Sequence, residues 1–279
     1  MAVREQVLTD IAISIADIPV VLRVPDVSQH SRLLQHYADF LVDPLALQAP
    51  RAVVDVLVRP GARFVPIEPG PWVIQVGYHD GRYTYKSYLE TGSLDMATRR
   101  GELVMAPEGT VENFLRGLYA WLALEDGGLL LHAAGLIRDG RGYVFFGASG
   151  SGKTTVTRLS MPQATVLSDD LVILRRCEGV LHVCGVPFRG ALLEAPRVNA
   201  RAPLAGLYRL AKAEQHRLEP LPRAAGIAEL IGSAPFVVKD LRINGTLMAV
   251  CGQVQNALPV QRLHFRKDDG FWKVIDAQA

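Results

Sequence analysis

Short apolar runs separated by turn residues fill the first 105 residues of the chain, and this pattern predicts a small α+β domain. Leucine and tyrosine side chains recur at helical spacing within residues 30–40. Strands are predicted where apolar and polar residues alternate or β-branched residues cluster: residues 9–24, 51–59, 72–77 and 83–89. The last two form a hairpin if Asp80 and Gly81 make its turn. This section shows no catalytic constellation, so packing, oligomerisation and substrate recognition all remain open as its role.

A second domain is predicted over residues 106–279, and it begins with a helix at residues 111–126 that bridges the two domains. Gly127 and Gly128 end that helix. The remainder mixes strands with helices, which is an α/β pattern. Strands are predicted at residues 129–137, 143–146, 164–175, 241–251 and 260–265. Helices are predicted at residues 155–161, 207–216 and 224–235, and the closing segment FWKVID packs an aromatic end.

The stretch between strand 143–146 and helix 155–161 carries the clearest chemical signal. Residues 147–154, GASGSGKT, match G-x-x-x-x-G-K-[ST], and the flanking elements favour a phosphate loop over a chance Gly/Ser-rich turn. The backbone N–H groups of such a loop wrap a phosphate, and the helix N-terminus adds a partial positive charge. Lys153 is expected to reach the β- and γ-phosphates of ATP, and the Thr154 hydroxyl is expected to hold Mg²⁺. The predicted nucleotide-binding residues are Gly147, Ala148, Ser149, Gly150, Ser151, Gly152, Lys153, Thr154 and Thr155.

A hairpin argument places His132 near this loop. Asp139 and Gly140 are a two-residue turn signal between strands 129–137 and 143–146. If they form the turn, the numbers of paired residues sum to 279, and His132 lies opposite Gly147 with Cα atoms about 5 Å apart. The histidine is then beside the nucleotide phosphates. A core histidine with a structural hydrogen bond is the alternative that the pattern leaves open.

Asp169 and Asp170 interrupt the apolar run at residues 164–175. Two adjacent carboxylates are costly to bury without a partner, and a Mg²⁺–phosphate complex is a natural partner. One carboxylate can serve the metal while the other takes a proton from an attacking hydroxyl. The alternative is a β-turn whose aspartates face solvent, which the apolar flanks disfavour.

A loop within residues 179–204 contains three arginines, Arg189, Arg197 and Arg201. Arginines near a phosphate loop can clamp a phosphate or a carboxylate through paired hydrogen bonds. A Pro/Gly/Arg-rich loop could also close over an extended peptide. These arginines are therefore the tentative substrate-binding residues, and a solvated loop is the alternative.

Composition and charge argue against several classes of protein. The chain of 279 residues is 49% hydrophobic and carries a net charge of +2, so it gives no electrostatic case for a nucleic-acid or membrane partner. No apolar run approaches the roughly 20 residues of a membrane span, and the first ten residues lack the apolar core of a signal peptide. The three cysteines favour a reducing, cytoplasmic location, and the scattered histidines suggest no zinc site.

The segment LLHAAGLIRDGRGYVFFGASGSGKTT, followed by LSDDLVIL, resembles the catalytic domain of HPr kinase/phosphorylase. This resemblance implies a P-loop kinase core of the type shared with ATP-dependent phosphoenolpyruvate carboxykinase. More closely, the chain looks like the HPr-kinase-related proteins of peptide-biosynthesis clusters, including kinases that phosphorylate the C-terminal serine of lasso-peptide precursors. The likeness is strong over residues 127–190, looser to the C-terminus and weak before residue 110.

The resemblance also implies roles for individual residues. Asp170 is the base that deprotonates the acceptor hydroxyl, Asp169 supports it or the metal, and His132 assists near the phosphates. Residues 188–190 look like part of the family signature, but Pro187 stands where the family has a metal-linked glutamate. That departure predicts little of the reverse, phosphorylase-type reaction.

The expectation is therefore a Mg-ATP-dependent kinase that phosphorylates a serine near the C-terminus of a ribosomally made, lasso-type peptide. A small-molecule hydroxyl kinase and a non-catalytic nucleotide-binding partner protein are the alternatives, although a protein without turnover would often have lost Lys153 or the Asp pair. The N-K-x-D motif of switch GTPases and the L-S-G-G-Q motif of ABC ATPases are absent. The sequence leaves open the choice between ATP and GTP, and whether the protein is a homo-oligomer.

Overall fold

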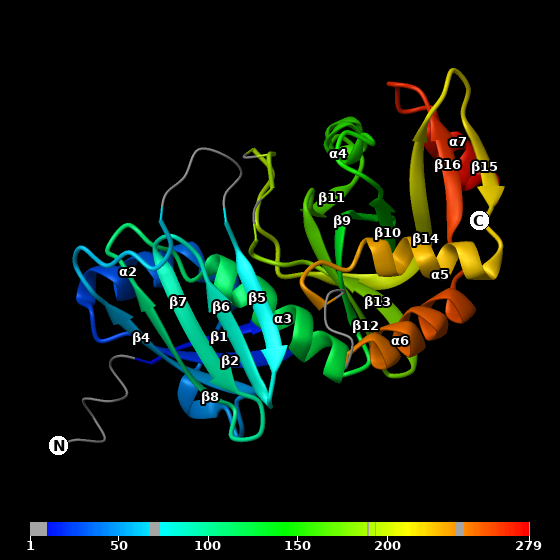
Figure 1. The fold of residues 1–279 in the computed structure, drawn as a ribbon. Helices are drawn as coiled ribbons and strands as arrows, with labels where there is room; N and C mark the ends of the chain where they lie inside the picture. The colour runs from blue at the N-terminus through cyan, green and yellow to red at the C-terminus, as the bar shows by residue number, and fades with distance from the viewer. Residues whose placement is uncertain (1–9, 67–72, 189, 193, 238–242, 279) are drawn as a thin grey trace. The chain divides into compact units, whose positions relative to one another are not determined.

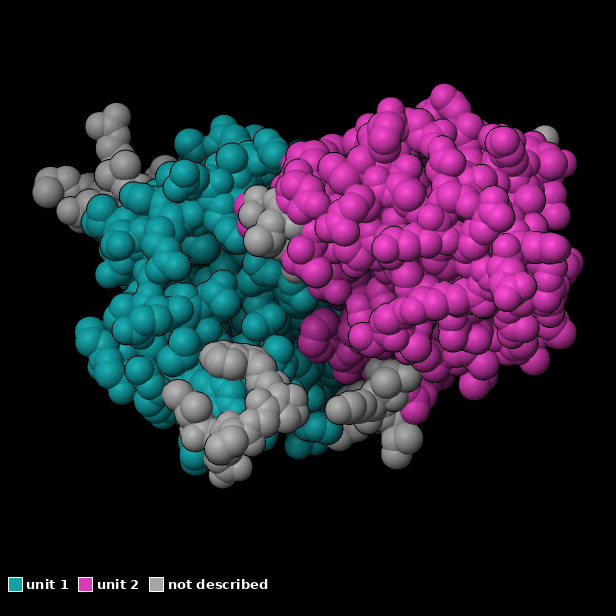
Figure 2. Space-filling model, turned by 90° about the horizontal axis from the view of Figure 1, so that it is seen from above, with its two compact units in different colours: residues 1–122 teal, residues 123–279 magenta. Residues whose placement is uncertain are grey.

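The computed structural model describes residues 10–66, 73–188, 190–192, 194–237 and 243–278. The described chain is mixed α/β, with two large sheets, and it divides into two compact units, residues 1–122 and residues 123–279 (Figures 1 and 2). This division falls within helix α3 (Glu112–Glu125), whereas the boundary predicted between residues 105 and 106 precedes that helix. Among the described helices, none is long and apolar enough to cross a membrane.

Unit 1 contains an eight-stranded sheet with the strand order β3-β1-β2-β4-β8-β7-β6-β5. The strands are β1 (Asp10–Ile15), β2 (Ile18–Arg23), β3 (Leu41–Val42), β4 (Ala52–Val58), β5 (Gln75–His79), β6 (Arg82–Lys86), β7 (Glu90–Asp95) and β8 (Arg100–Met105). Its helices besides α3 are α2 (Val27–His36) and the short 3-10 helices η1 (Ala38–Phe40) and η2 (Pro44–Ala46). The predicted hairpin is confirmed for β5 and β6, and its turn residues Asp80 and Gly81 have φ of 51° and 72°.

Helix α3 packs on one face of this sheet (Figure 1). The contact is specific as well as apolar, because two buried tyrosine hydroxyls of the sheet donate to carbonyl oxygens of the helix. Tyr78 donates to Gly117 at 2.8 Å, and Tyr83 donates to Phe114 at 2.7 Å. A Cβ atom at Gly117 would lie 2.5 Å from the Tyr83 hydroxyl, so only glycine allows this close approach.

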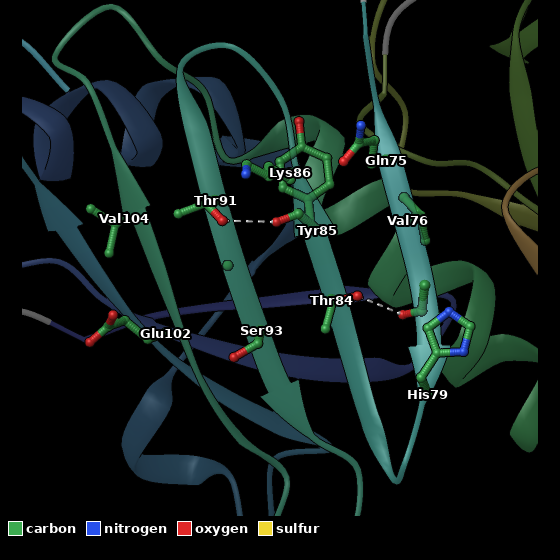
Figure 3. A pocket seen from close by; sticks show the side chains of 12 residues that line it. Gln75, Val76, His79, Thr84, Tyr85, Lys86, Thr91, Ser93, Glu102 and Val104 are labelled. Atoms are coloured by element: carbon green, nitrogen blue, oxygen red, sulfur yellow. Dashed lines mark hydrogen bonds between the residues drawn. The ribbon is translucent and has the colours of Figure 1, made fainter. Parts of the chain in front are cut away.

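The other side of strands β5 to β8 carries an open hollow of about 550 Å³ (Figure 3). Thr84 and Lys86 point into it, in alternation with the buried Tyr83 and Tyr85. The described residues form no group of histidine, cysteine and carboxylate side chains that could hold a metal, here or elsewhere.

Unit 2 is built on a sheet with the strand order β10-β9-β12-β13-β14-β16-β15, in which β11 also pairs with β9 and β10 also pairs with β14. Because of that last pairing, strands β9, β10, β14, β13 and β12 close a ring. The strands are β9 (Leu129–Arg138), β10 (Arg141–Phe146), β11 (Thr165–Ser168), β12 (Leu171–Cys177), β13 (Val180–Cys184), β14 (Arg201–Lys212), β15 (Arg217–Pro220) and β16 (Gln261–Phe265). The helices are α4 (Lys153–Ser160), α5 (Arg223–Gly232), α6 (Asn244–Ala257) and α7 (Phe271–Asp276).

The predicted aromatic end of the chain is confirmed, and it forms helix α7. Phe271 and Trp272 are buried in the core of unit 2, where Trp272 meets the Phe145 ring edge to face at 5.8 Å between centroids. The Trp272 indole N–H also donates to Ser160 Oγ at 3.1 Å. Because Ser160 ends α4, this bond ties α7 to α4, the helix that follows the glycine loop.

Two of the predicted elements are wrong. Residues 207–216 were predicted as a helix, but residues up to Lys212 belong to β14, which lies parallel between β10 and β16. A strand buried on both faces has no alternation, so its apolar run does not differ from that of a buried helix. Residues 241–251 were predicted as a strand, but the described part forms most of α6, whose buried side chains recur at helical spacing. These side chains are Leu247, Val250, Cys251, Val254 and Gln255.

Candidate functional site

The glycine loop connects the end of β10 to the start of α4, as the sequence motif requires. Gly147 and Gly152 have φ of 152° and 111°, values that other residues rarely adopt. A Cβ atom at Gly152 would also lie 2.5 Å from Cζ of the buried Phe265 ring. Glycine is therefore needed at position 152 for two reasons: its backbone angle, and the lack of space for a Cβ atom beside the Phe265 ring.

Lys153 is the first residue of α4, and its side chain folds back across the loop. The ammonium group donates to the Gly147 carbonyl oxygen at 2.9 Å, and the residue is only 8% exposed. Burial lowers the pKa of Lys153 below its usual value, whereas Asp170 and Asp169 act in the opposite direction. The cation is thus held at the loop, close enough to both aspartates to interact with them.

Asp169 and Asp170 lie at the predicted break in the strand. Strand β11 ends at Ser168 and β12 begins at Leu171, and both pair with the long strand β9. The Ser168 hydroxyl accepts the N–H groups of Asp170 and Leu171, each at 3.1 Å, and so stabilises the break. The alternative prediction, a turn whose aspartates face solvent, is wrong, because Asp169 is buried and Asp170 is half-buried.

The two aspartates have different surroundings. The Asp169 carboxylate accepts the N–H of Leu192 at 2.9 Å, and a Cβ atom at Gly190 would lie 2.4 Å from its Oδ1. Asp169 therefore supports the segment that follows β13. Asp170 instead faces His132, with 3.3 Å between Oδ1 and the histidine Nε2. The Asp170 carboxylate is the more accessible of the two, with 24% of its side chain exposed.

The hairpin register that placed His132 is confirmed where β9 and β10 pair. Arg138 pairs with Arg141 and Ala133 pairs with Phe146, so the numbers sum to 279. His132 and Gly147 follow this last pair, and both line a cavity of about 230 Å³. The core-histidine alternative is wrong, because the His132 side chain is 46% exposed.

These groups meet in one pocket of about 320 Å³. It is lined by the predicted residues His132, Ser149, Gly150, Gly152, Lys153, Thr154, Thr155, Asp169 and Asp170, together with Ala191 and Lys212. Lys212 was not among the predicted site residues, since it lies within residues 207–216, which were predicted as a helix. The structure explains its position, because β14 runs parallel to β10 and both strands end at the glycine loop.

The structure does not bring the tentative substrate arginines to this pocket. Arg197 donates from Nε to the Pro187 carbonyl oxygen at 2.9 Å, within its own loop. Arg201 begins β14, where it pairs with Cys184 of β13. Neither lines the pocket among the described residues, and Arg189 lies outside the described residues. A carboxylate clamp made by Arg197 and Arg201 is therefore not supported.

A family model described as SynChlorMet cassette protein ScmC matches residues 110–277, more than half of the chain. The chain therefore belongs to the ScmC family. The match includes every residue that lines the pocket. No curated protein matches the chain.

Proposed function

We propose that this protein is a Mg-ATP-dependent kinase that transfers the γ-phosphoryl group of ATP to a hydroxyl group. The observation that supports it most is the single pocket in which a glycine loop and Lys153 face Asp170 and His132. A loop of this sequence, placed before a helix, suits a chain of phosphates. A carboxylate that touches a histidine suits removal of a proton from the acceptor.

The residues at the loop fit a nucleotide and its metal ion. Lys153 would exchange the Gly147 carbonyl oxygen for an oxygen of the β- or γ-phosphate. The Thr154 hydroxyl and the Asp169 carboxylate both line the pocket and offer the hard oxygen ligands that Mg²⁺ prefers. Bound Mg²⁺ would neutralise the phosphate charge. The P-loop kinase core implied by the resemblance to HPr kinase is part of this proposal.

Asp170 is the proposed base, because it is the more accessible carboxylate and Asp169 already accepts a backbone N–H. Asp170 takes the proton of the acceptor hydroxyl as that oxygen attacks the γ-phosphorus. The bond from the γ-phosphorus to the bridging oxygen breaks, and ADP leaves. His132 positions the Asp170 carboxylate through its Nε2 contact.

His132→Ala is expected to lower kcat about tenfold to a hundredfold, because Asp170 loses the group that orients it. The melting temperature should change little, since the side chain is 46% exposed. His132→Gln retains a hydrogen-bond donor and should recover part of the lost rate. Kinetics and thermal melts of the two variants test this. A large fall in melting temperature with unchanged activity per folded molecule would instead assign a structural role.

The proposed acceptor is a serine near the end of a peptide, on the strength of the resemblance to lasso-precursor kinases. Recognition of the peptide by Arg197 and Arg201 is not part of the proposal, given their positions. A small-molecule hydroxyl is the second candidate acceptor, because the cavity beside His132 has a volume of only about 230 Å³.

The test offers Mg-ATP with three acceptors: precursor peptides encoded beside the gene, their C-terminally amidated forms and free serine. Mass spectrometry should detect one added phosphoryl group on a peptide serine with the native protein and none with Lys153→Ala. Preference for free serine or a sugar would favour the small-molecule kinase. Nucleotide binding without transfer to any acceptor would favour the non-catalytic partner protein. Rapid release of pyrophosphate from the phosphopeptide and inorganic phosphate would contradict the argument from Pro187.

A further inference from the structure

A second cavity, of about 440 Å³, adjoins the pocket of about 320 Å³ that contains Lys153 and the two aspartates. The two share Gly152, Thr155 and Lys212, so the cavity begins at the phosphate loop. Neither Asp169 nor Asp170 lines it, and neither does His132. The cavity therefore lies on the side of the loop away from the carboxylates.

The topology of unit 2 explains why a cavity lies there. Strand β14 runs parallel to β10 on one side and to β16 on the other, so the carboxyl ends of all three lie at one edge. Phe146 ends β10, Lys212 ends β14 and Phe265 ends β16. Ligands of α/β proteins bind in the crevice outside the carboxyl ends of parallel strands.

The lining of this cavity combines an apolar floor with cations. The Phe265 ring is buried against Gly152, while Lys212, Arg266 and Lys267 are exposed. Among the described residues, Lys212 and Lys267 form no ion pair, whereas Asp268 binds the Arg266 guanidinium. The Arg266 guanidinium is a planar cation, the kind of surface on which an aromatic ring stacks, and the ion pair with Asp268 holds it in place.

We infer that this cavity holds the nucleoside end of the bound nucleotide. The inference rests on the proposed function. In a phosphate loop the lysine reaches the β- and γ-phosphates, and here that lysine lines the same pocket as the two aspartates. The γ-phosphate thus lies on the carboxylate side, and the α-phosphate and nucleoside continue past Thr155 into the cavity. Lys212, which lines both spaces, binds the phosphate chain, and Arg266 stacks on the base.

The experiment measures binding of Mg-ATP and of Mg-tripolyphosphate, which lacks the nucleoside, by calorimetry. Arg266→Ala removes the stacking cation, and Ala213→Leu adds bulk at a residue that lines the cavity. Both should weaken ATP binding about tenfold and leave tripolyphosphate binding within about twofold. Lys212→Ala should weaken both ligands. Lys273→Ala, an exposed lysine of α7 that does not line the cavity, is the control and should change neither.

Unchanged ATP affinity in both Arg266→Ala and Ala213→Leu would overturn the inference, as would an equal loss for both ligands. If steady-state kinetics of these two variants showed a higher KM for the acceptor while ATP affinity was unchanged, the cavity would be assigned to the acceptor. Failure of the proposed function would look different. In that case the native protein would bind neither ligand, or Lys153→Ala would bind tripolyphosphate as tightly as the native protein does, and the nucleoside assignment would fall with it.

Discussion

Lys153→Ala is expected to abolish detectable phosphoryl transfer and to weaken binding of Mg-ATP by about tenfold or more. The lysine is the buried cation of the glycine loop, and no other residue of that loop carries a positive charge. Loss of one preorganised donor to the charge that develops in a transition state typically costs about 10² to 10³ in kcat, and a hydrogen bond to a charged group contributes about 1.5–3 kcal/mol.

The measurement is a phosphoryl-transfer assay together with calorimetric titration of Mg-ATP. Lys153→Met keeps the length of the side chain and should be as inactive as alanine, because the charge is what matters. Lys273→Ala, on α7, controls for a general loss of positive charge. A thermal melt of each variant separates loss of the Lys153–Gly147 hydrogen bond from loss of folding. If Lys153→Ala retained both native affinity and native turnover, the phosphate-loop assignment would have to be abandoned.

Asp170→Asn is expected to lower kcat by about 10² to 10⁴ and to leave the affinity for Mg-ATP within about twofold. The amide cannot take a proton from the acceptor, but it has nearly the same shape and can still contact His132. The affinity for nucleotide should hold because the role proposed for Asp170 is to take a proton from the acceptor.

Asp169→Asn is the matched variant, because it makes the same change at the neighbouring carboxylate. It should shift the Mg²⁺ concentration needed for activity, since this carboxylate is the proposed metal ligand. Titrations of rate against Mg²⁺ and against ATP distinguish the two variants. The opposite pattern would exchange the roles of the two aspartates, and full activity in both would leave the pocket without a base.

Much of the site could be predicted because it depends on short stretches of sequence. Asp139 and Gly140 both have positive φ, 52° and 72°, as in the two-residue hairpin turn that an Asp-Gly pair favours because both residues tolerate positive φ. That turn sets the register of β9 against β10 and so brings His132 to the loop. The break at Asp169 and Asp170 was also predictable, since two carboxylates interrupt an apolar run.

Other parts of the site could not be predicted from local pattern. Residues 207–212 are apolar enough for either a buried helix or a central strand, and their pairing with β10 and β16 selects the strand. The position of Lys212 follows from that pairing. The position of Arg197 depends on the path of its loop, which the local sequence pattern does not determine. In the structure Arg197 donates to the Pro187 carbonyl oxygen and does not line the pocket.

Local patterns in the sequence were enough to predict the glycine loop, the helix behind it and the hairpin that carries His132, because turn chemistry and glycine spacing act over a few residues. Long-range packing, in contrast, buries Asp169 under the segment at Leu192 and turns Asp170 toward His132. It also decided that Lys212, and not Arg197 or Arg201, lies beside the loop among the described residues. These outcomes depend on contacts between segments far apart in the chain, which no local pattern encodes.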